Sequence, residues 1–345
     1  IEEPRAGEVR VRVSHCGVCH SDLSMVNGSF PGLTPVILGH EAAGTVDAVG
    51  PGVATLAPGD KVVLTPTPSC GECYWCVRNE HSLCANSSAI VLSAFPDGST
   101  RLSRGGEVVY RGVGVGAFAE FVITQASGAV KVPDDTPLDV ACVIGCAMQT
   151  GVGAVLNTAA VQPGDTVLVA GLGGIGLAAV QGARIAGATR IIASDPVPER
   201  REHAHRLGAT DTIDPTADDL VATVMGLTGV GVDHAFECAG RASLISTLLD
   251  ACRGGGTVVC VGAPALDEAI VIDPAVMFTA SGKRLLGCLL GSVNSRREIP
   301  RLLDLWRRGL LDLESMITAR GTLDDIESAF ADLAAGRGVR TVLAI

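Results

Sequence analysis

The sequence feature that most constrains this chain is a glycine-rich turn placed directly after a short apolar run. Residues 166–170 (TVLVA) are typical of a buried parallel strand, and the turn that follows reads GLGGIG, a GxGxxG spacing. In such a turn the first glycine permits the bend, the second lets the backbone approach a pyrophosphate, and the third lets the next helix pack on the strand. The N-terminus of that helix faces the phosphates. The residues predicted to form this phosphate-binding turn are Gly171, Gly173, Gly174, Ile175 and Gly176.

An acidic residue follows where a dinucleotide-binding turn requires one. Asp195 comes about 20 residues after the turn, directly after the predicted strand 190–194, where its carboxylate can accept hydrogen bonds from an adenosine ribose. A lone GxGxxG is often a turn without a ligand, but here the strand, the helix and the carboxylate come in order. The stretch 166–195 therefore predicts a dinucleotide-binding βαβ unit.

Length and composition bound the class of protein. A chain of 345 residues is long enough for two domains, and 43 glycines with only 3% aromatic residues favour a turn-rich α/β protein. The net charge of −11 argues against nucleic acid and anionic membranes as partners. No apolar run has the length of a membrane span, and no signal peptide pattern precedes the first predicted strand. Twelve cysteines in so long a chain fit a reducing compartment, so the cytoplasm is the expected location.

The apolar pattern changes along the chain. Residues 8–13 (EVRVRV) alternate as a half-buried strand does, 41–63 carries the turn signals of short antiparallel strands, and 118–124 returns to strand. Residues 85–115 are rich in Ser, Gly, Asp and Arg and are expected to form an excursion on the surface. From residue 166 onward, strands alternate with helices, which favours a parallel sheet. The further strands predicted are 232–237, 256–261, 284–290 and 340–344, and the helices are 199–207, 220–227, 242–252, 296–308 and 324–335.

Four cysteines close together in the sequence predict a closed metal site. Cys70, Cys73, Cys76 and Cys84 form C-x2-C-x2-C-x7-C, so four thiolates can surround one zinc ion and leave no open position, as in a structural site. An iron–sulfur cluster is a weaker alternative because the fourth cysteine comes late and no proline follows it. Cysteines without a metal, or in disulfides, are the remaining alternative. A nucleic-acid zinc finger fits poorly, because the chain is acidic and lacks the paired histidines.

A second set of candidate ligands is scattered along the chain. Cys19, His40 and Cys146, taken singly, are more often a buried thiol or a satisfied core histidine than metal ligands. The neighbours of His40 change this interpretation. Residues 39–53 (GHEAAGTVDAVGPGV) match the pattern GHE-x2-G-x5-G-x2-V, and the chain thereby resembles the zinc-containing alcohol dehydrogenases of the medium-chain dehydrogenase/reductase superfamily over essentially its whole length.

The resemblance implies a two-domain α/β fold. A GroES-like β-rich catalytic domain would comprise residues 1–147 and 290–345, and a Rossmann-type domain with a doubly wound parallel sheet would comprise 148–289. The substrate would bind in the cleft between them. Members of the branch with long excursions tend to be dimers, so a homodimer is expected.

The resemblance also implies a catalytic zinc site. Cys19, His40 and Cys146 would bind this ion and leave the fourth position for water or the alcohol oxygen, which suits Lewis-acid chemistry. Asp22 would orient His40 through the other ring nitrogen, and Glu41 would lie behind the ligands with it. The two cofactors implied are therefore zinc, one catalytic and one structural ion per subunit, and NAD.

Further roles follow from the same resemblance. Ser21 would accept the alcohol proton, and Thr150 would touch the nicotinamide. His20, Arg200 and Arg340 would offer positive charge or hydrogen-bond donors to the coenzyme, although for the two arginines alone a solvated surface charge would be the simpler interpretation.

Two departures from the family pattern bear on function. Many members pass the alcohol proton to a histidine at the position of Ser24, so the relay must end differently here or use water. Members that oxidise the glutathione adduct of formaldehyde carry an acidic residue and an arginine where this chain has Phe30 and Ser88. Pro66 and Ala263 occupy pocket positions that are often bulkier, which favours a roomy apolar pocket.

The sequence therefore predicts an NAD-dependent, zinc-dependent oxidoreductase acting on a primary or secondary alcohol, or on the corresponding aldehyde or ketone in reverse. Within enzymes, the alternative is a zinc polyol or formaldehyde dehydrogenase. From another class, the alternative is a non-catalytic NAD-binding relative, against which the intact catalytic ligand set speaks.

Overall fold

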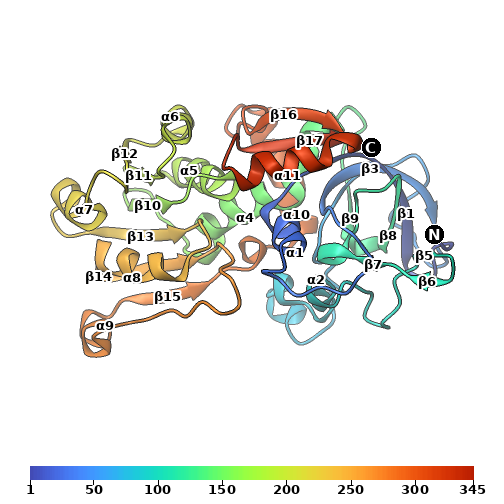
Figure 1. The fold of residues 1–345 in the computed structure, drawn as a ribbon, viewed down its shortest axis with the longest axis horizontal. Helices are drawn as coiled ribbons and strands as arrows, with labels where there is room; N and C mark the ends of the chain where they lie inside the picture. The colour runs from blue at the N-terminus through green and yellow to red at the C-terminus, as the bar shows by residue number, and fades with distance from the viewer. The chain divides into compact units, whose positions relative to one another are not determined.

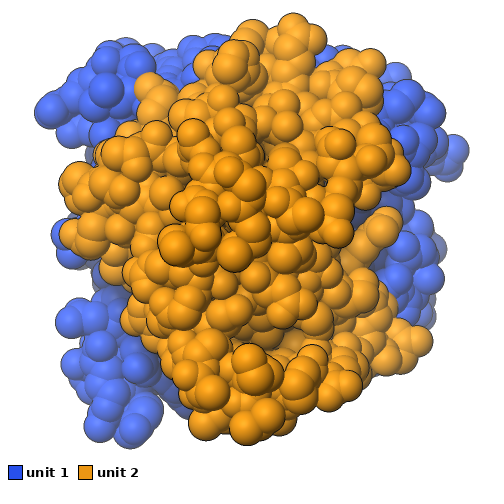
Figure 2. Space-filling model, turned by 90° about the vertical axis from the view of Figure 1, so that its left-hand side faces the viewer, with its two compact units in different colours: residues 1–149, 293–345 blue, residues 150–292 orange.

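A computed structural model describes residues 1–345, and the chain divides into two compact units, which Figure 2 distinguishes by colour. The first unit comprises residues 1–149 and 293–345, and the second comprises residues 150–292. No single helix is both long and apolar enough to cross a membrane. The bent pair Leu138–Gly145 and Ala147–Thr158 is long and apolar enough only when its two helices are counted together.

The first unit is built on a seven-stranded sheet. Its strand order is β16-β17-β1-β3-β4-β9, with β8 paired to β1. The strands of this sheet are β1 (Glu8–Gly17), β3 (Glu41–Val49), β4 (Lys61–Leu64), β8 (Phe121–Gln125), β9 (Ala129–Lys131), β16 (Ile317–Thr322) and β17 (Arg340–Ala344). Neighbours pair antiparallel except β16 and β17, which are parallel.

The alternation predicted for the first strand is confirmed. Val9, Val11 and Val13 are at most 3% exposed, whereas Arg12 between them is exposed. Burying one side of such a strand contributes on the order of 1.5–3 kcal/mol for each valine. These valines pack in one cluster whose other members include Val46, Val62, Leu64, Val115 and Val122.

Helices and short strands complete the first unit. They are α1 (His20–Val26), β2 (Val36–Ile37), α2 (Ala89–Leu92), β5 (Ser103–Arg104), β6 (Glu107–Val108), β7 (Tyr110–Arg111), α3 (Leu138–Ala141), α10 (Ser295–Arg307) and α11 (Ile326–Ala334). The predicted helix 296–308 is confirmed, and the predicted helix 324–335 is found as α11 preceded by a 3-10 turn.

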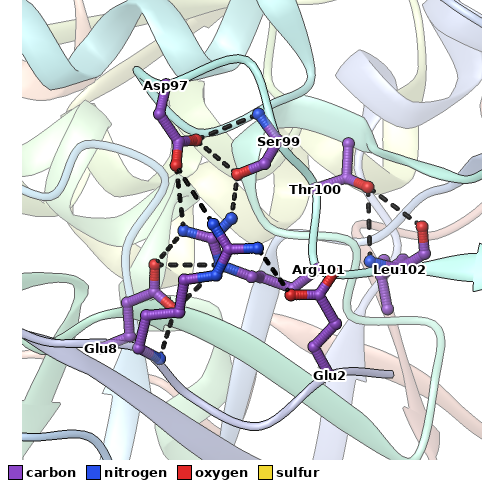
Figure 3. A network of polar contacts seen from close by, with 8 residues as sticks. Glu2, Glu8, Asp97, Ser99, Thr100, Arg101 and Leu102 are labelled. Atoms are coloured by element: carbon purple, nitrogen blue, oxygen red, sulfur yellow. Dashed lines mark hydrogen bonds and ion pairs between the residues drawn. The ribbon is translucent and has the colours of Figure 1, made fainter.

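The excursion 85–115 is anchored in the interior, and the expectation that it lies on the surface is wrong in this respect. Arg101 is 4% exposed, and its guanidinium lies 2.6 Å from the Glu8 carboxylate, which is also buried (Figure 3). Asp97 lies 3.2 Å from the same guanidinium. Arg101 and Arg111 both lie over the buried ring of Phe95, at 4.7 and 3.8 Å from its centroid. The polar composition misled the sequence prediction because these arginines are buried through charge pairing and ring contacts.

The second unit is a six-stranded parallel sheet of strand order β12-β11-β10-β13-β14-β15 (Figure 1). Counted within the unit, this is the order 3-2-1-4-5-6 of the Rossmann fold, which confirms the predicted fold class. The strands are β10 (Thr166–Ala170), β11 (Arg190–Ser194), β12 (Asp211–Ile213), β13 (Val232–Glu237), β14 (Cys252–Cys260) and β15 (Arg284–Gly287). The helices are α5 (Gly174–Ala186), α6 (Pro198–Leu207), α7 (Leu220–Thr228), α8 (Ala242–Ala251) and α9 (Ala275–Ser281), while α4 (Ala147–Gly153) crosses the boundary between the units.

The strand order reverses between β10 and β13. In open α/β sheets, ligands bind at the carboxyl ends of the strands beside such a reversal. The glycine turn follows β10 directly, so the fold places it at this position.

Candidate active site and metal centres

Three side chains from distant parts of the first unit meet in one cluster. Cys19 precedes α1, His40 precedes β3, and Cys146 precedes α4. The Sγ atoms of the two cysteines and a ring nitrogen of His40 all lie within 4.8 Å of one another. The predicted grouping of these residues is therefore present in the structure.

Asp22 fixes the orientation of the His40 ring. Its carboxylate lies 3.1–3.2 Å from His40 Nδ1 and accepts a hydrogen bond of 2.8 Å from the Gly39 N–H. His40 Nε2 is buried and has no hydrogen-bond partner in the protein. A buried ring nitrogen without a partner beside two thiols is suited to metal coordination, with the carboxylate holding the other nitrogen protonated.

Glu41 and Arg340 form a buried ion pair behind the cluster. Glu41 Oε1 lies 3.1 Å from Arg340 Nη2 and also accepts a 3.1 Å hydrogen bond from the Ala147 N–H, next to Cys146. Burial raises the pKa of Glu41 to about 7 even though the charge of Arg340 opposes the rise. The pair therefore connects β3, β17 and the start of α4 around the ligand cluster.

The surroundings of Cys19 favour a thiolate. The hydrogen bond from the Cys146 thiol lowers the pKa of Cys19 well below its ordinary value, and the charge of Arg340 acts in the same direction. Arg340 Nη2 lies 3.8 Å from Cys19 Sγ, and Nη1 lies 3.3 Å from the Val18 carbonyl oxygen. Since thiolate sulfur and neutral imidazole are zinc ligands, the residues present fit a zinc ion.

The other residues predicted near this site lie on α1. Ser21 Oγ is 4.0 Å from Cys19 Sγ, so the structure brings the predicted proton acceptor beside the cluster. His20 begins α1 and is exposed. The predicted coenzyme role of Arg340 stays a prediction, because every contact described for it is within the first unit. Its pairing with Glu41 was missed, and no local signal in the sequence connects the two residues.

The four remaining candidate ligands form a separate lobe of the first unit. The Sγ atoms of Cys70, Cys73, Cys76 and Cys84 lie within 4.8 Å of one another, with separations such as 3.6 Å between Cys84 and Cys70. All four cysteines are free thiols. The predicted closed set is therefore assembled, and the disulfide alternative does not describe it.

Backbone N–H groups point at the sulfur atoms of this lobe. Cys84 Sγ accepts from the N–H groups of Cys70 and Asn86 at 3.3 and 3.4 Å, and Cys70 Sγ accepts from that of Cys73 at 3.4 Å. Backbone hydrogen bonds from Ala85 and Cys76 lower the pKa of Cys73 to about 6. Donors aimed at sulfur stabilise thiolates, so the lobe fits a zinc ion held by four sulfurs.

The glycine turn of the second unit has the geometry of a phosphate-binding turn. Gly171 has a φ of +90°, and a Cβ added there would stand 2.6 Å from the Ala239 nitrogen. A Cβ added at Gly176 would stand 1.8 Å from the Gly171 carbonyl oxygen, whereas one at Gly173 would meet no atom within 4 Å. Open space therefore adjoins Gly173 where helix α5 begins, as a bound pyrophosphate requires. Gly174 and Ile175 form the first turn of this helix.

Asp195 lies at the end of β11 and contacts the same turn. It is 4% exposed and accepts hydrogen bonds from the N–H groups of Leu172, at 2.7 Å, and Val197, at 2.9 Å. Arg200 Nη1 lies 3.8 Å from the Asp195 carboxylate. Thr150 is buried and precedes Gly151, where an added Cβ would stand 2.3 Å from the Ile175 carbonyl oxygen. Asp195 therefore contacts the glycine turn directly and Arg200 lies beside Asp195, whereas the coenzyme role of Thr150 stays a prediction.

Comparisons with known proteins agree with this geometry. The model of the alcohol dehydrogenase GroES-like domain matches residues 5–134, and that of the zinc-binding dehydrogenase domain matches residues 174–308. An S-(hydroxymethyl)glutathione dehydrogenase of Escherichia coli is 39% identical over 99% of this chain and 94% of its own length.

Solved structures give the same result. An alcohol dehydrogenase zinc-binding domain protein from Burkholderia ambifaria is 37% identical with a TM-score of 0.94, covering 100% of this chain and 93% of its own. The benzyl alcohol dehydrogenase from Acinetobacter calcoaceticus is 32% identical with a TM-score of 0.92, and the match covers 100% of this chain and 94% of the other.

Proposed function

The chain belongs to the zinc-containing alcohol dehydrogenases of the medium-chain dehydrogenase/reductase superfamily, and from this premise we propose the residues, substrate class and assembly with which it acts. Its reaction is reversible hydride transfer between an alcohol and NAD, with zinc as the metal. The observation that carries the proposal is the cluster of Cys19, His40 and Cys146, in which the first two residues are buried and His40 Nε2 has no partner in the protein.

We assign two zinc ions different roles. Cys19, His40 and Cys146 hold the catalytic ion, and the cysteine lobe 70–84 holds the structural one. When bound, the catalytic zinc supplies a Lewis acid for the substrate oxygen, and NAD supplies the hydride acceptor.

The protein groups prepare this site before substrate arrives. Asp22 keeps the Nδ1 proton on His40, so that Nε2 is free to donate its lone pair. Glu41 accepts a hydrogen bond from the Ala147 N–H and forms an ion pair with Arg340. These two contacts together fix the start of α4 relative to β17. The Ser21 hydroxyl lies beside Cys19 and would accept the alcohol proton while it releases its own proton to water.

The coenzyme assignment uses the second unit. The turn from Gly171 to Gly176 holds the pyrophosphate, Asp195 the adenosine ribose and Thr150 the nicotinamide. Arg200, beside Asp195, completes the coenzyme contacts of this unit.

The proposed substrate is an apolar primary or secondary alcohol larger than ethanol. Support comes from the uncharged side chains of Phe30 and Ser88; Ser88 Oγ donates to the Ala85 carbonyl oxygen at 2.9 Å. The relative from Acinetobacter acts, by its name, on benzyl alcohol. The second candidate is S-(hydroxymethyl)glutathione, which the 39% identity to dehydrogenases of that name favours. This adduct carries two carboxylates and an ammonium group, which need charged partners.

The proposed assembly is a cytoplasmic homodimer formed through the second unit. Strand β15 is the edge of the parallel sheet, and the segment before it exposes apolar side chains. These side chains are between 45 and 75% exposed: Leu266, Ile270, Val271, Val276 and Met277. Light scattering of the purified protein tests this, with a monomer expected for the double variant Val276→Glu, Met277→Glu.

The function is tested by a substrate screen. NADH absorbance is followed with ethanol, benzyl alcohol, a secondary alcohol, a polyol, and formaldehyde with glutathione. The proposal expects the highest kcat/KM with benzyl alcohol or the secondary alcohol. A rate with formaldehyde that requires glutathione and exceeds all others would establish the second candidate instead.

A further inference from the structure

Glu237 is a fully buried carboxylate at the end of β13, the strand next to β10 at the reversal of strand order. Burial raises the pKa of Glu237, and backbone N–H groups oppose the rise. Its Oε2 atom has no hydrogen-bond partner. A buried carboxylate oxygen without a partner costs free energy, so the hydrogen bonds that the other atoms of Glu237 make must offset this cost.

Those atoms connect two chain segments that follow neighbouring strands. Glu237 Oε1 accepts hydrogen bonds from the N–H groups of Ala239, at 2.9 Å, and Arg241, at 3.3 Å. Its carbonyl oxygen accepts from Val261 at 2.9 Å and Gly262 at 2.8 Å. One residue therefore fixes both the loop 238–241 after β13 and the chain that leaves β14.

The loop held in this way forms one side of the glycine turn. The Ala239 nitrogen and Cα lie 2.6 and 2.8 Å from the position that a Cβ on Gly171 would take. The Cys238 N–H donates to the Ala170 carbonyl oxygen at 2.8 Å. Because protein interiors are close-packed, a displacement of the loop must displace the turn as well.

The position of Glu237 Oε2 also explains why a second residue, at position 262, is a glycine. A Cβ added at Gly262 would stand 2.6 Å from Glu237 Oε2 and 2.2 Å from the Gly240 nitrogen. The absence of a side chain at Gly262 is therefore required for the carboxylate to reach the loop.

We propose that Glu237 is a positioning residue for the coenzyme, which holds the loop 238–241 against Gly171 so that the phosphate-binding turn is preformed. The proposal rests on the assignment of NAD to the second unit. It predicts that the hydrogen-bond acceptor at Glu237 determines the affinity for coenzyme.

The test compares NADH binding to the zinc-loaded protein and three variants at position 237. Glu237→Gln keeps an acceptor, Glu237→Met removes it at similar volume, and Glu237→Asp shortens its reach. Calorimetric Kd for NADH is expected to rise about tenfold in Glu237→Met, because two backbone hydrogen bonds lose a charged acceptor, and to stay within about threefold in Glu237→Gln. The KM for NAD should rise in parallel while the KM for the alcohol changes less than about twofold.

A neighbouring carboxylate supplies the matched control. Glu268 accepts a 2.8 Å hydrogen bond from the Ala242 N–H, but it lies at the surface, and it acts on Glu237 only through its charge, which helps to raise the pKa of Glu237. Glu268→Gln should leave the NADH Kd unchanged.

The outcomes separate this inference from the coenzyme assignment. A folded Glu237→Met protein with the wild-type Kd, even at lowered Tm, would overturn the inference and leave the assignment intact. A wild-type protein that binds no NADH would overturn both. A Glu237→Gln protein as weak as Glu237→Met would overturn the hydrogen-bond mechanism. If Glu237→Met does not fold, Glu237→Asp decides: a raised Kd supports the inference, and the wild-type Kd overturns it.

Discussion

Arg340 and Glu41 form an ion pair of 3.1 Å in which both side chains are at most 4% exposed. Arg340 comes from the last strand of the chain and Glu41 directly follows the candidate zinc ligand His40. A carboxylate at this depth is tolerated because the guanidinium neutralises it, and the loss of one partner leaves the other charge uncompensated.

Replacement of Arg340 by methionine should therefore destabilise the protein itself. We expect Arg340→Met to lower the free energy of unfolding by about 3–5 kcal/mol in the absence of coenzyme, because Glu41 is left buried without its ion-pair partner. The measurement is denaturant unfolding of the zinc-loaded protein without NAD. Arg337 is the control, since its pair with Asp332 is exposed and Arg337→Met should cost less than about 1 kcal/mol. Equal stability of the two variants would contradict this account of Arg340.

The two cysteine clusters should respond differently to loss of a ligand. Cys146→Ser removes a ligand of the proposed catalytic ion, so turnover should be abolished while the unfolding midpoint changes little. Cys73→Ser opens a closed set, and because a structural zinc contributes folding free energy directly, it should lower the unfolding midpoint. Elemental analysis should give two zinc ions per wild-type chain and about one in each variant. Turnover by Cys146→Ser, or full activity with fewer than two ions, would show the assignment to be wrong.

How much the sequence could predict depended on how far apart in the sequence the interacting residues lie. The strands 166–170, 190–194 and 232–237 are confirmed, because their signals are runs of apolar residues that lie within the element itself. The grouping of Cys70, Cys73, Cys76 and Cys84 was readable from their spacing in a single loop. Cys19, His40 and Cys146 were grouped only through the resemblance, since the fold and not the local sequence brings them together.

The interactions that escaped prediction are buried pairs between distant segments. Arg101 belongs to a polar stretch, and only β1 supplies the Glu8 carboxylate that allows it to be buried.

The helix α1 was not predicted either, because HSDLSMV has no apolar repeat and its one fully buried residue is Asp22. A prediction that takes buried positions to be apolar cannot find a helix whose buried side chain is a carboxylate that orients a metal-ligating histidine.

The proton path should change when an imidazole is placed on α1. Ser24 follows Ser21 by one helical turn, so the two side chains project from neighbouring positions on one face. A histidine there, with an ordinary pKa of about 6.5, adds a base that is half neutral just below pH 7. We therefore expect Ser24→His to raise the rate of alcohol oxidation between about pH 6 and 7, and to bring no gain at pH 9. Superimposable pH profiles of kcat/KM for the two proteins would remove Ser24 from the proton path.

Preference for NAD over NADP should depend on Asp195. Its carboxylate already accepts two backbone hydrogen bonds, from Leu172 at 2.7 Å and Val197 at 2.9 Å, and each oxygen keeps a second lone pair for a ribose hydroxyl. The 2′-phosphate of NADP would meet this carboxylate as a like charge. At a separation of about 5 Å and an effective dielectric of about 20, a pair of unit charges costs roughly 3 kcal/mol, or a factor on the order of 10² in binding. Arg200, 3.8 Å from the same carboxylate, offsets part of this cost.

Two variants separate the charge of Asp195 from its hydrogen bonds. Asp195→Asn removes the charge and keeps one acceptor, so it should shift the ratio of kcat/KM for NAD and NADP toward NADP by about tenfold or more while the turn stays in place. Asp195→Ala also leaves the Leu172 N–H without its acceptor, so it should weaken binding of both coenzymes in addition to shifting the ratio. The measurement is kcat/KM with each coenzyme at a saturating alcohol concentration. Equal use of the two coenzymes by the wild type, or an unchanged ratio in Asp195→Asn, would show that the carboxylate organises the glycine turn without reading the ribose.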